Sequence, residues 1–180
     1  VKAAVLDNSI VRTGITVYCL GDPQGAILQV QPADSIQWYQ NGVPIPGANG
    51  TQYIVVQTGT YHATVFSFTG CNLTTADEDI TVYAQPAAGF TSNGNEQCFN
   101  GHQFIFTNTS TVSAGALQYT WNLGEGTIQT GTDITYSYTK YAPYTVTLLV
   151  TATGGCLDSG SFNGNVSQTA TSIFTAPPGY

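Results

Sequence analysis

The feature that most restricts the fold of this chain is a series of short strand-like segments that occurs twice. Each segment is rich in β-branched or aromatic residues and is bounded by Gly, Pro or Asn, as β-strands separated by turns are. No stretch keeps a helical apolar period over three turns, so helix is predicted to be nearly absent. The expected strands cover residues 26–30, 35–40, 52–56, 60–68 and 79–83, and then 103–110, 117–123, 133–139 and 144–152.

The two series correspond in the order of their residue types. In each, a Cys precedes a strand, a strand centred on Trp38 or Trp121 follows, and a Tyr-led strand is followed by Gly-Cys at Cys71 or Cys156. The segment AQPAAG (84–89) between the two series has the composition of a linker. Strands at this spacing predict an all-β protein of two tandem antiparallel β-sandwiches. One larger sandwich or barrel is the alternative, and the internal repeat argues against it.

We therefore expect one domain in residues 1–84 and a second in residues 85–168, followed by a tail, residues 169–180. The end of the tail, SIFTAPPGY (172–180), resembles AAGFTSNGN (87–95) at the start of the second domain. It is interpreted as the start of a further repeat, as a donor strand that completes a neighbouring sheet, or as an ordinary last strand.

Charge is scarce in this sequence. Charged residues make up 7% of the chain and the net charge is −7, since the cations are only Lys2, Arg12 and Lys140. Binding to a phosphate backbone or to an anionic membrane surface requires several cations, so both partners are excluded. No run approaches the roughly 18 apolar residues of a membrane span, so no membrane insertion is expected.

The motifs resemble two known module families. IQWYQNGVPIPGANGTQYIV (36–55), followed by GTYHATV (59–65), resembles the immunoglobulin-like modules of Bacteroidetes surface proteins, with a Trp strand before an NG-containing hairpin. Residues 88–168, which contain FTNTS, YTWNLGEG, YTVTLLV and GGCLDSG, resemble a PKD domain. The resemblance implies an Ig-like sandwich followed by a PKD-like sandwich, in a surface-exposed spacer, adhesive or fibre-forming module without catalysis.

The match to the usual PKD pattern is degenerate. In the W-x-F-G-D-G signature, Leu123 and Glu125 stand in place of Phe and Asp. The His of the following H-x-Y strand is not found, since Ser137 precedes Tyr138, and Pro143 replaces the Gly of G-x-Y-x-V. The marks that match are nevertheless numerous and occur in the usual order.

Glu125 is a single carboxylate between two glycines, in WNLGEG (121–126). In a sandwich, Trp121 points inward from a central strand and Gly-Glu-Gly makes the turn to the next strand. We interpret Glu125 as a solvated turn residue that accepts hydrogen bonds from nearby backbone N–H groups. A weak cation site and a catalytic acid are the alternatives.

The sequence contains no convincing catalytic pattern. The acidic residues fall in predicted turns or at strand ends, whereas glycoside hydrolysis needs two carboxylates that face one bond. Only Asp77, Glu78 and Asp79 cluster, and neighbouring strand residues point to opposite faces. His62 is expected to face outward from a strand and His102 to lie in a loop, and neither zinc-ligand spacing nor a G-x-S-x-G elbow occurs. We expect no enzyme, no metal and no cofactor, with calcium at residues 77–79 as the alternative.

Tyrosines form the remaining candidate contact site. Tyr136, Tyr138, Tyr141 and Tyr144 crowd together in the sequence. Aromatic rings can stack on sugars or pack against a protein partner, although core packing also accounts for many of them. Tyr136, Tyr138 and Tyr141 are therefore candidates for contact with a ligand or partner.

The four cysteines leave two disulfide pairings open. Pairing within each domain joins Cys19 to Cys71 and Cys98 to Cys156. The early and late Cys of a domain, however, lie before and after strands that run the same way, and a strand of six residues spans about 20 Å. A disulfide allows at most about 7 Å between Cα atoms. In a head-to-tail string of domains, Cys19 pairs instead with Cys156, and Cys71 pairs with Cys98 between successive chains.

The sequence as a whole predicts a non-enzymatic extracellular module. Cysteines in a chain poor in charge suggest an oxidising, extracellular or cell-surface location. The predicted role is that of a cell-surface stalk, an adhesin segment or a self-assembling filament subunit. Its expected partners are copies of itself, joined head to tail, or neighbouring domains of a longer protein, and glycans are a further candidate. The alternative role is a carbohydrate-binding accessory module of a secreted hydrolase.

Overall fold

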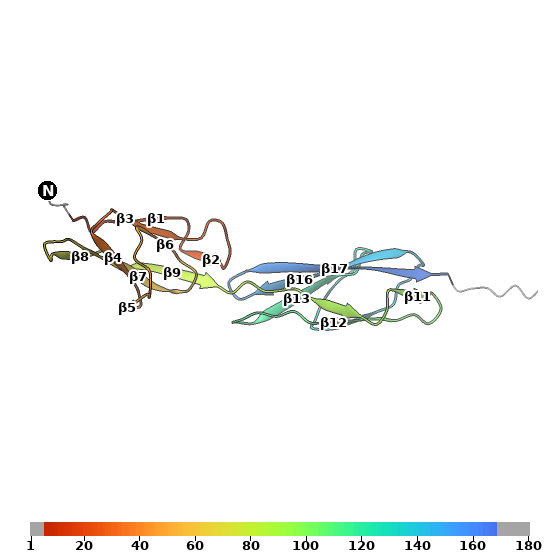
Figure 1. Cartoon of the computed structure of the whole chain (residues 1–180). Coiled ribbons are helices and arrows are strands. Elements are labelled where there is room, and N and C mark those ends of the chain that lie inside the picture. Colours follow the sequence, from red (N-terminus) through yellow and green to blue (C-terminus); the bar gives the residue numbers. More distant parts are fainter. Residues whose placement is uncertain (1–5, 169–180) are drawn as a thin grey trace, which may run out of the picture. The chain divides into compact units, whose positions relative to one another are not determined.

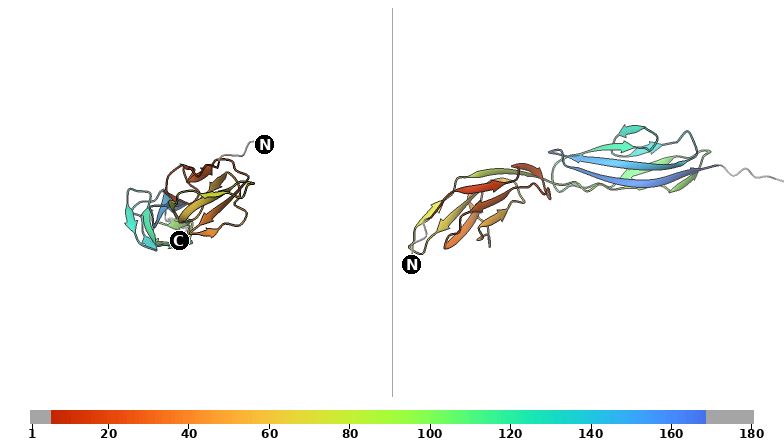
Figure 2. Two further views of the ribbon diagram at one scale, coloured as in Figure 1. Left: turned by 90° about the vertical axis from the view of Figure 1, so that its left-hand side faces the viewer. Right: turned by 90° about the horizontal axis from the view of Figure 1, so that it is seen from above.

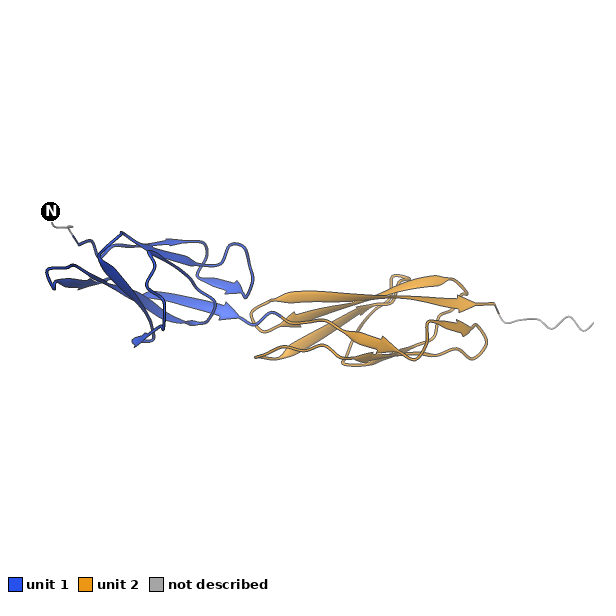
Figure 3. Cartoon of the chain, viewed as in Figure 1, with its two compact units in different colours: residues 1–85 blue, residues 86–180 orange. Residues whose placement is uncertain are grey.

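The computed structural model describes residues 6–168, and the chain divides into two compact units, residues 1–85 and 86–180 (Figure 3). Every regular element in the described part of the chain is a β-strand (Figure 1). Within the same residues no helix has the length and apolarity needed to cross a membrane. The interpretations of the tail, residues 169–180, lie outside the described residues.

Unit 1 is a sandwich of two sheets (Figure 2). One sheet has the order β1-β3-β6, and the other has the order β2-β9-β7-β4-β5, with β8 paired to β7. The strands are β1 (Ile10–Thr13), β2 (Val17–Cys19), β3 (Ile27–Val30), β4 (Ser35–Gln40), β5 (Val43–Pro44), β6 (Gln52–Ile54), β7 (Gly59–Phe66), β8 (Asn72–Thr74) and β9 (Glu78–Tyr83).

Unit 2 repeats this plan. Its sheets have the orders β10-β12-β15 and β11-β17-β16-β13-β14, and its described residues, 86–168, contain no counterpart of β8. The strands are β10 (Phe90–Ser92), β11 (Glu96–Cys98), β12 (Phe104–Asn108), β13 (Leu117–Asn122), β14 (Ile128–Thr130), β15 (Ile134–Tyr136), β16 (Pro143–Ala152) and β17 (Leu157–Ser167). The predicted fold class, two tandem antiparallel β-sandwiches, is confirmed.

In each unit an early strand pairs in parallel with the last strand. In unit 1, β2 pairs with β9, and Cys19 lies opposite Tyr83. In unit 2, β11 pairs with β17, and Cys98 lies opposite Ser167. Because the paired strands run the same way, the chain enters each sandwich at one end and leaves it at the other.

A tryptophan lies in the core of each unit, as the sequence predicts. Trp38 packs with Leu28, Tyr61 and other apolar side chains in unit 1. Trp121 packs with Phe104, Phe106 and their neighbours in unit 2. Each indole also satisfies its N–H group, since Trp38 donates to the Gly50 carbonyl and Trp121 to the Gly131 carbonyl. Each sandwich therefore has its own hydrophobic core.

Tyr61 makes the stability of unit 1 sensitive to alkali. Its ring is fully buried and its hydroxyl donates to the Gln57 carbonyl over 2.8 Å. Burial, with smaller contributions from Tyr53 and Tyr18, raises the pKa of Tyr61 from 10.0 to about 12. The stability that this pKa difference contributes is fully present below pH 10 and is lost as the pH rises to about 12, because the unfolded chain loses the proton first.

We therefore expect the free energy of unfolding of unit 1 to fall between pH 10 and about 12, measured by urea unfolding at fixed pH. Tyr61→Phe should make this fall shallower, although Tyr18, whose pKa burial also raises, keeps part of it. Equal pH dependence in the two proteins would contradict the role given to Tyr61.

Candidate functional site

All ten acidic side chains accept hydrogen bonds within their own unit. Several bind a backbone N–H group and fix a turn or a loop, as Asp34 does with Phe68, Asp133 with Asn108 and Asp158 with Ala88. The remaining acidic residues are Asp7, Asp22, Asp77, Glu78, Asp79, Glu96 and Glu125. Among the described residues no three His, Cys, Asp or Glu side chains are grouped as metal ligands would be.

The acidic run at the start of β9, residues 77–79, contacts three different partners. Asp77 contacts the His62 ring over 2.9 Å, Glu78 pairs with Arg12 over 2.9 Å, and Asp79 accepts from the Thr60 hydroxyl over 2.6 Å. Alternation in the extended segment separates Glu78 from Asp77 and Asp79, so the three carboxylates do not converge, as predicted. Calcium at this run stays a prediction.

Glu125 lies at the tip of the β13–β14 hairpin. Gly124 and Gly126, on either side of it, have φ angles of +88° and +85°, which place both in the left-handed region. The carboxylate accepts a short hydrogen bond from the Tyr136 hydroxyl, and this bond is the main cause that raises the pKa of Tyr136. The predicted turn is present, but the carboxylate binds a tyrosine from β15 rather than nearby backbone N–H groups.

The predicted tyrosine cluster divides into buried and exposed members. Tyr138 is only 4% exposed, its ring stacks on Tyr144 with centroids 3.6 Å apart, and its hydroxyl donates to the Leu123 carbonyl. Burial raises the pKa of Tyr138 strongly, with Glu125 and neighbouring tyrosines adding to it. Tyr136 is half-buried, whereas Tyr141 is 57% exposed. The prediction placed Tyr138 at the surface, but its ring packs in the core of unit 2 and its hydroxyl binds a backbone carbonyl.

His102 contacts both the exposed Phe99 and the backbone of the buried Tyr138. Its Nε2 accepts a hydrogen bond from the Tyr138 backbone N–H over 2.7 Å, so Nδ1 carries the proton and donates to the Phe99 carbonyl. The ring also stacks on Phe99, and Phe99 meets Tyr141 edge to face. His102 is thus a structural residue that fixes the loop carrying Phe99. Sequence reasoning did not single out Phe99.

His62 is also structural. It faces outward from β7, as predicted, and its ring stacks on Tyr39 with centroids 4.9 Å apart. Neither histidine lies beside a Ser or Cys in the arrangement that nucleophilic catalysis uses.

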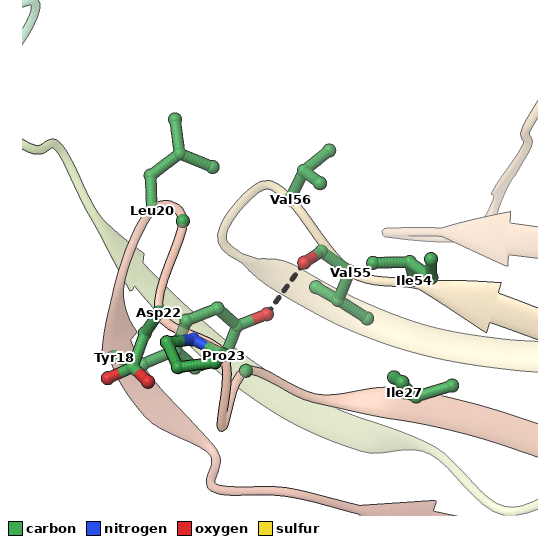
Figure 4. A pocket seen from close by; sticks show the side chains of 10 residues that line it. Tyr18, Leu20, Asp22, Pro23, Ile27, Ile54, Val55 and Val56 are labelled. Atoms are coloured by element: carbon green, nitrogen blue, oxygen red, sulfur yellow. Dashed lines mark hydrogen bonds between the residues drawn. The ribbon is translucent and has the colours of Figure 1, made fainter.

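Unit 1 has a small apolar hollow of about 180 Å³ (Figure 4). Leu20 and Val56 project from two facing loops, and the Tyr18 hydroxyl donates to the Val55 carbonyl between them. Asp22 is the acidic residue in the lining, and its carboxylate already accepts a hydrogen bond from the Gln24 backbone N–H. The hollow therefore offers apolar contact but few polar groups to orient a substrate.

The cysteines are in two states. Cys19 and Cys156 are disulfide-bonded, whereas Cys71 and Cys98 are exposed free thiols. The predicted pairing within each domain is thus not present. In unit 1 the reason is geometric. Cys19 lies opposite Tyr83, at the end of the sandwich where β9 finishes, whereas Cys71 lies in the turn between β7 and β8, at the other end. A bond between Cys71 and Cys98 of successive chains stays a prediction.

The two sandwiches define the class of the chain, a tandem all-β protein whose acidic side chains accept hydrogen bonds within their own unit. Residues 83–166 match the family described as PKD domain. The match covers most of unit 2, so this part of the chain is similar to a PKD domain. The immunoglobulin-like identity of unit 1 and its Bacteroidetes origin stay predictions.

Several solved structures are similar to the chain. The PKD1 domain from Vibrio cholerae metalloprotease PrtV is 34% identical, with a TM-score of 0.41, over 47% of this chain and 99% of that domain. The PKD1 domain of Vibrio anguillarum Epp is 27% identical, with a TM-score of 0.42, over 47% of this chain and 96% of that domain. A structure of carbohydrate-binding modules from the β-sandwich superfamily is 27% identical, with a TM-score of 0.44, over 47% of this chain and 35% of that one. No curated protein matches the chain.

Proposed function

We propose that the chain is a non-enzymatic extracellular structural module, used as a stalk, an adhesin segment or a filament subunit. The observation that carries the proposal is that all ten carboxylates accept hydrogen bonds within their own unit. Side chains held in this way stabilise turns and strand ends, and they are dispersed instead of facing one bond. The PKD domain and the disulfide-bonded cysteines support an extracellular role.

The strand order also suits a module that transmits tension. Force applied to the two ends of unit 1 passes through β1, which pairs with β3, before it acts along the parallel pair β2–β9. In unit 2 it passes through β10, which pairs with β12, before it acts along β11–β17. The hydrogen bonds of such a pair are strained together instead of opening one after another. In unit 2 a long antiparallel ladder between β16 and β17, from Pro143–Asn165 to Thr151–Leu157, supports the last strand.

A carbohydrate-binding accessory module of a secreted hydrolase is the second candidate. Exposed Tyr141 and Phe99 favour it, because neighbouring aromatic rings can stack on sugars. Glycan-array binding that is lost in Tyr141→Ala would support this candidate over the first.

Negative-stain microscopy of the purified chain tests the structural proposal. We expect rods or long regular fibres, and no hydrolysis of glycan or peptide substrates. Turnover that disappears in Glu125→Gln or Asp133→Asn would contradict the proposal, because it would make one of these turn residues a catalyst.

A further inference from the structure

Cys71 is the last residue of a hydrogen-bonded tip between β7 and β8. The Ser67 N–H donates to the Cys71 carbonyl over 2.9 Å, and the Gly70 N–H donates to the Ser67 carbonyl over 3.0 Å. The Phe68 N–H donates to the Asp34 carboxylate over 2.7 Å. This tip, residues 67–71, nevertheless presents a Phe68 side chain that is 92% exposed. An exposed aromatic ring on a hydrogen-bonded turn, beside a free thiol, is suited to insertion into a partner protein.

Cys98 lies beside a group of exposed rings in unit 2. It ends β11, and the following residue, Phe99, donates its N–H to the Ser167 carbonyl over 2.9 Å. Phe99 stacks on His102 and meets Tyr141 edge to face, with centroids 5.6 Å and 6.4 Å away. We name Phe99, His102 and Tyr141 the ring cluster. It offers aromatic faces and edges to an incoming phenylalanine.

Both thiols lie at defined ends of their own sandwiches. Phe66 pairs with Asn72 and with Ser35, so Cys71 lies at the end of unit 1 opposite the one where β9 finishes. Cys98 pairs with Ser167, at the end of unit 2 where β17 finishes. In a head-to-tail series, the end of unit 2 at which the chain leaves faces the first unit of the next copy.

The end of unit 1 carries carboxylates, whereas the end of unit 2 carries Lys140 and also Glu96 on β11. Asp34 lies beneath the tip, and the Asn8 side chain donates to the Thr74 carbonyl, which places neighbouring Asp7 at the same end. Lys140 is exposed in the loop that also carries Tyr141. An approach of the tip to the ring cluster therefore brings carboxylates toward an ammonium group.

We propose that Cys71 of one copy forms a disulfide with Cys98 of the next copy, with Phe68 packed on the ring cluster. The inference rests on the proposed structural role and identifies the partner as a second copy of this chain. The contact is heterologous and does not close, so it produces a linear polymer.

The reaction requires a disulfide oxidant such as glutathione disulfide. One cysteine thiolate attacks that disulfide, forms a mixed disulfide and releases one glutathione thiolate. The other cysteine, as its thiolate, attacks the protein sulfur of the mixed disulfide and displaces the second glutathione. Two protein thiols thus lose two protons and two electrons, and one glutathione disulfide becomes two glutathione thiols.

Mixing two single variants tests the pairing. Cys71→Ser retains Cys98, and Cys98→Ser retains Cys71, and both positions are exposed, so both variants should fold. With glutathione disulfide present, non-reducing electrophoresis should show a covalent dimer in the mixture and only monomer in each variant alone. The unchanged chain should give a ladder that collapses with thiol. Dimer in either variant alone, or none in the mixture, would overturn the proposal.

Phe68→Ser tests the contact around the bond. We expect cross-linking of the full chain to slow about tenfold, since a buried aromatic anchor contributes more than about 1.4 kcal/mol to such a contact. Val43→Ser is the matched control, because Val43 is also an exposed apolar residue of unit 1 but lies on β5, away from the tip. Equal slowing in both variants would refute the role of Phe68.

Microscopy of the same samples separates the two proposals. Fibres that form without a Cys71–Cys98 bond would overturn the disulfide and leave the structural role standing. Monomers without fibres under all conditions would overturn both the disulfide and assembly as a filament.

Discussion

Trp121→Ala is expected to lower the free energy of unfolding of unit 2 by about 3–5 kcal/mol. The Trp121 side chain is 0% exposed, and its ring meets Phe90 and Phe106 with centroids 4.9 Å and 6.0 Å away. Its indole N–H also donates to the Gly131 carbonyl over 2.9 Å. The substitution therefore leaves a cavity among aromatic rings and removes the hydrogen bond to the Gly131 carbonyl, and both effects destabilise the folded state.

Hydrogen exchange of peptides from β16 and β17 would measure this loss within unit 2. Ile128→Ala is the control, because Ile128 lies on neighbouring β14 but is 66% exposed. We expect the control to change stability by less than about 0.5 kcal/mol. A Trp121→Ala loss below about 1 kcal/mol would show that the indole is not central to the core.

The strands that the sequence predicts are those with strong local signals. Trp38 and Trp121 lie among β-branched and aromatic neighbours, and β4 and β13 begin where they were expected. The longest strand, β17, was not predicted, because Gly160, Asn163 and Gly164 are poor strand formers. Its conformation comes from pairing along β16 and from Phe162, which packs near Phe90 and Phe106. Partners distant in sequence thus determine this strand.

The dispersal of the carboxylates could be predicted, but the surface around the thiols could not. The predicted strand 60–68 places Phe68 within a sheet, whereas β7 ends at Phe66 and the tip then turns. Strand periodicity stops giving side-chain direction at such a turn. In the predicted strand 133–139 alternation continues past the end of β15 at Tyr136, because Ile134 and Tyr138 are both buried while Ser137 between Tyr136 and Tyr138 is exposed. The exposed Phe68 is therefore a consequence of an early strand end, whereas the buried Tyr138 lies on the same face as Ile134.

Gly124→Ala is expected to destabilise unit 2 by about 2–5 kcal/mol. The left-handed φ of +88° costs an alanine about 1–2 kcal/mol. A Cβ at this position would also lie 2.7 Å from the Thr145 carbonyl oxygen and 3.1 Å from the Thr145 nitrogen. Because these atoms belong to the backbone of β16, relief requires the hairpin or the strand to shift, which costs about 1–3 kcal/mol more.

Gly126→Ala separates these two causes. Gly126 has a similar φ of +85°, but an added Cβ there would meet nothing within 4 Å. We therefore expect Gly126→Ala to lose only the conformational part, about 1–2 kcal/mol, in urea unfolding of the same chain. The difference between the two variants measures the close approach of the WNLGEG turn to β16. Equal losses would mean that this approach is absent, and that the two glycines serve the turn conformation alone.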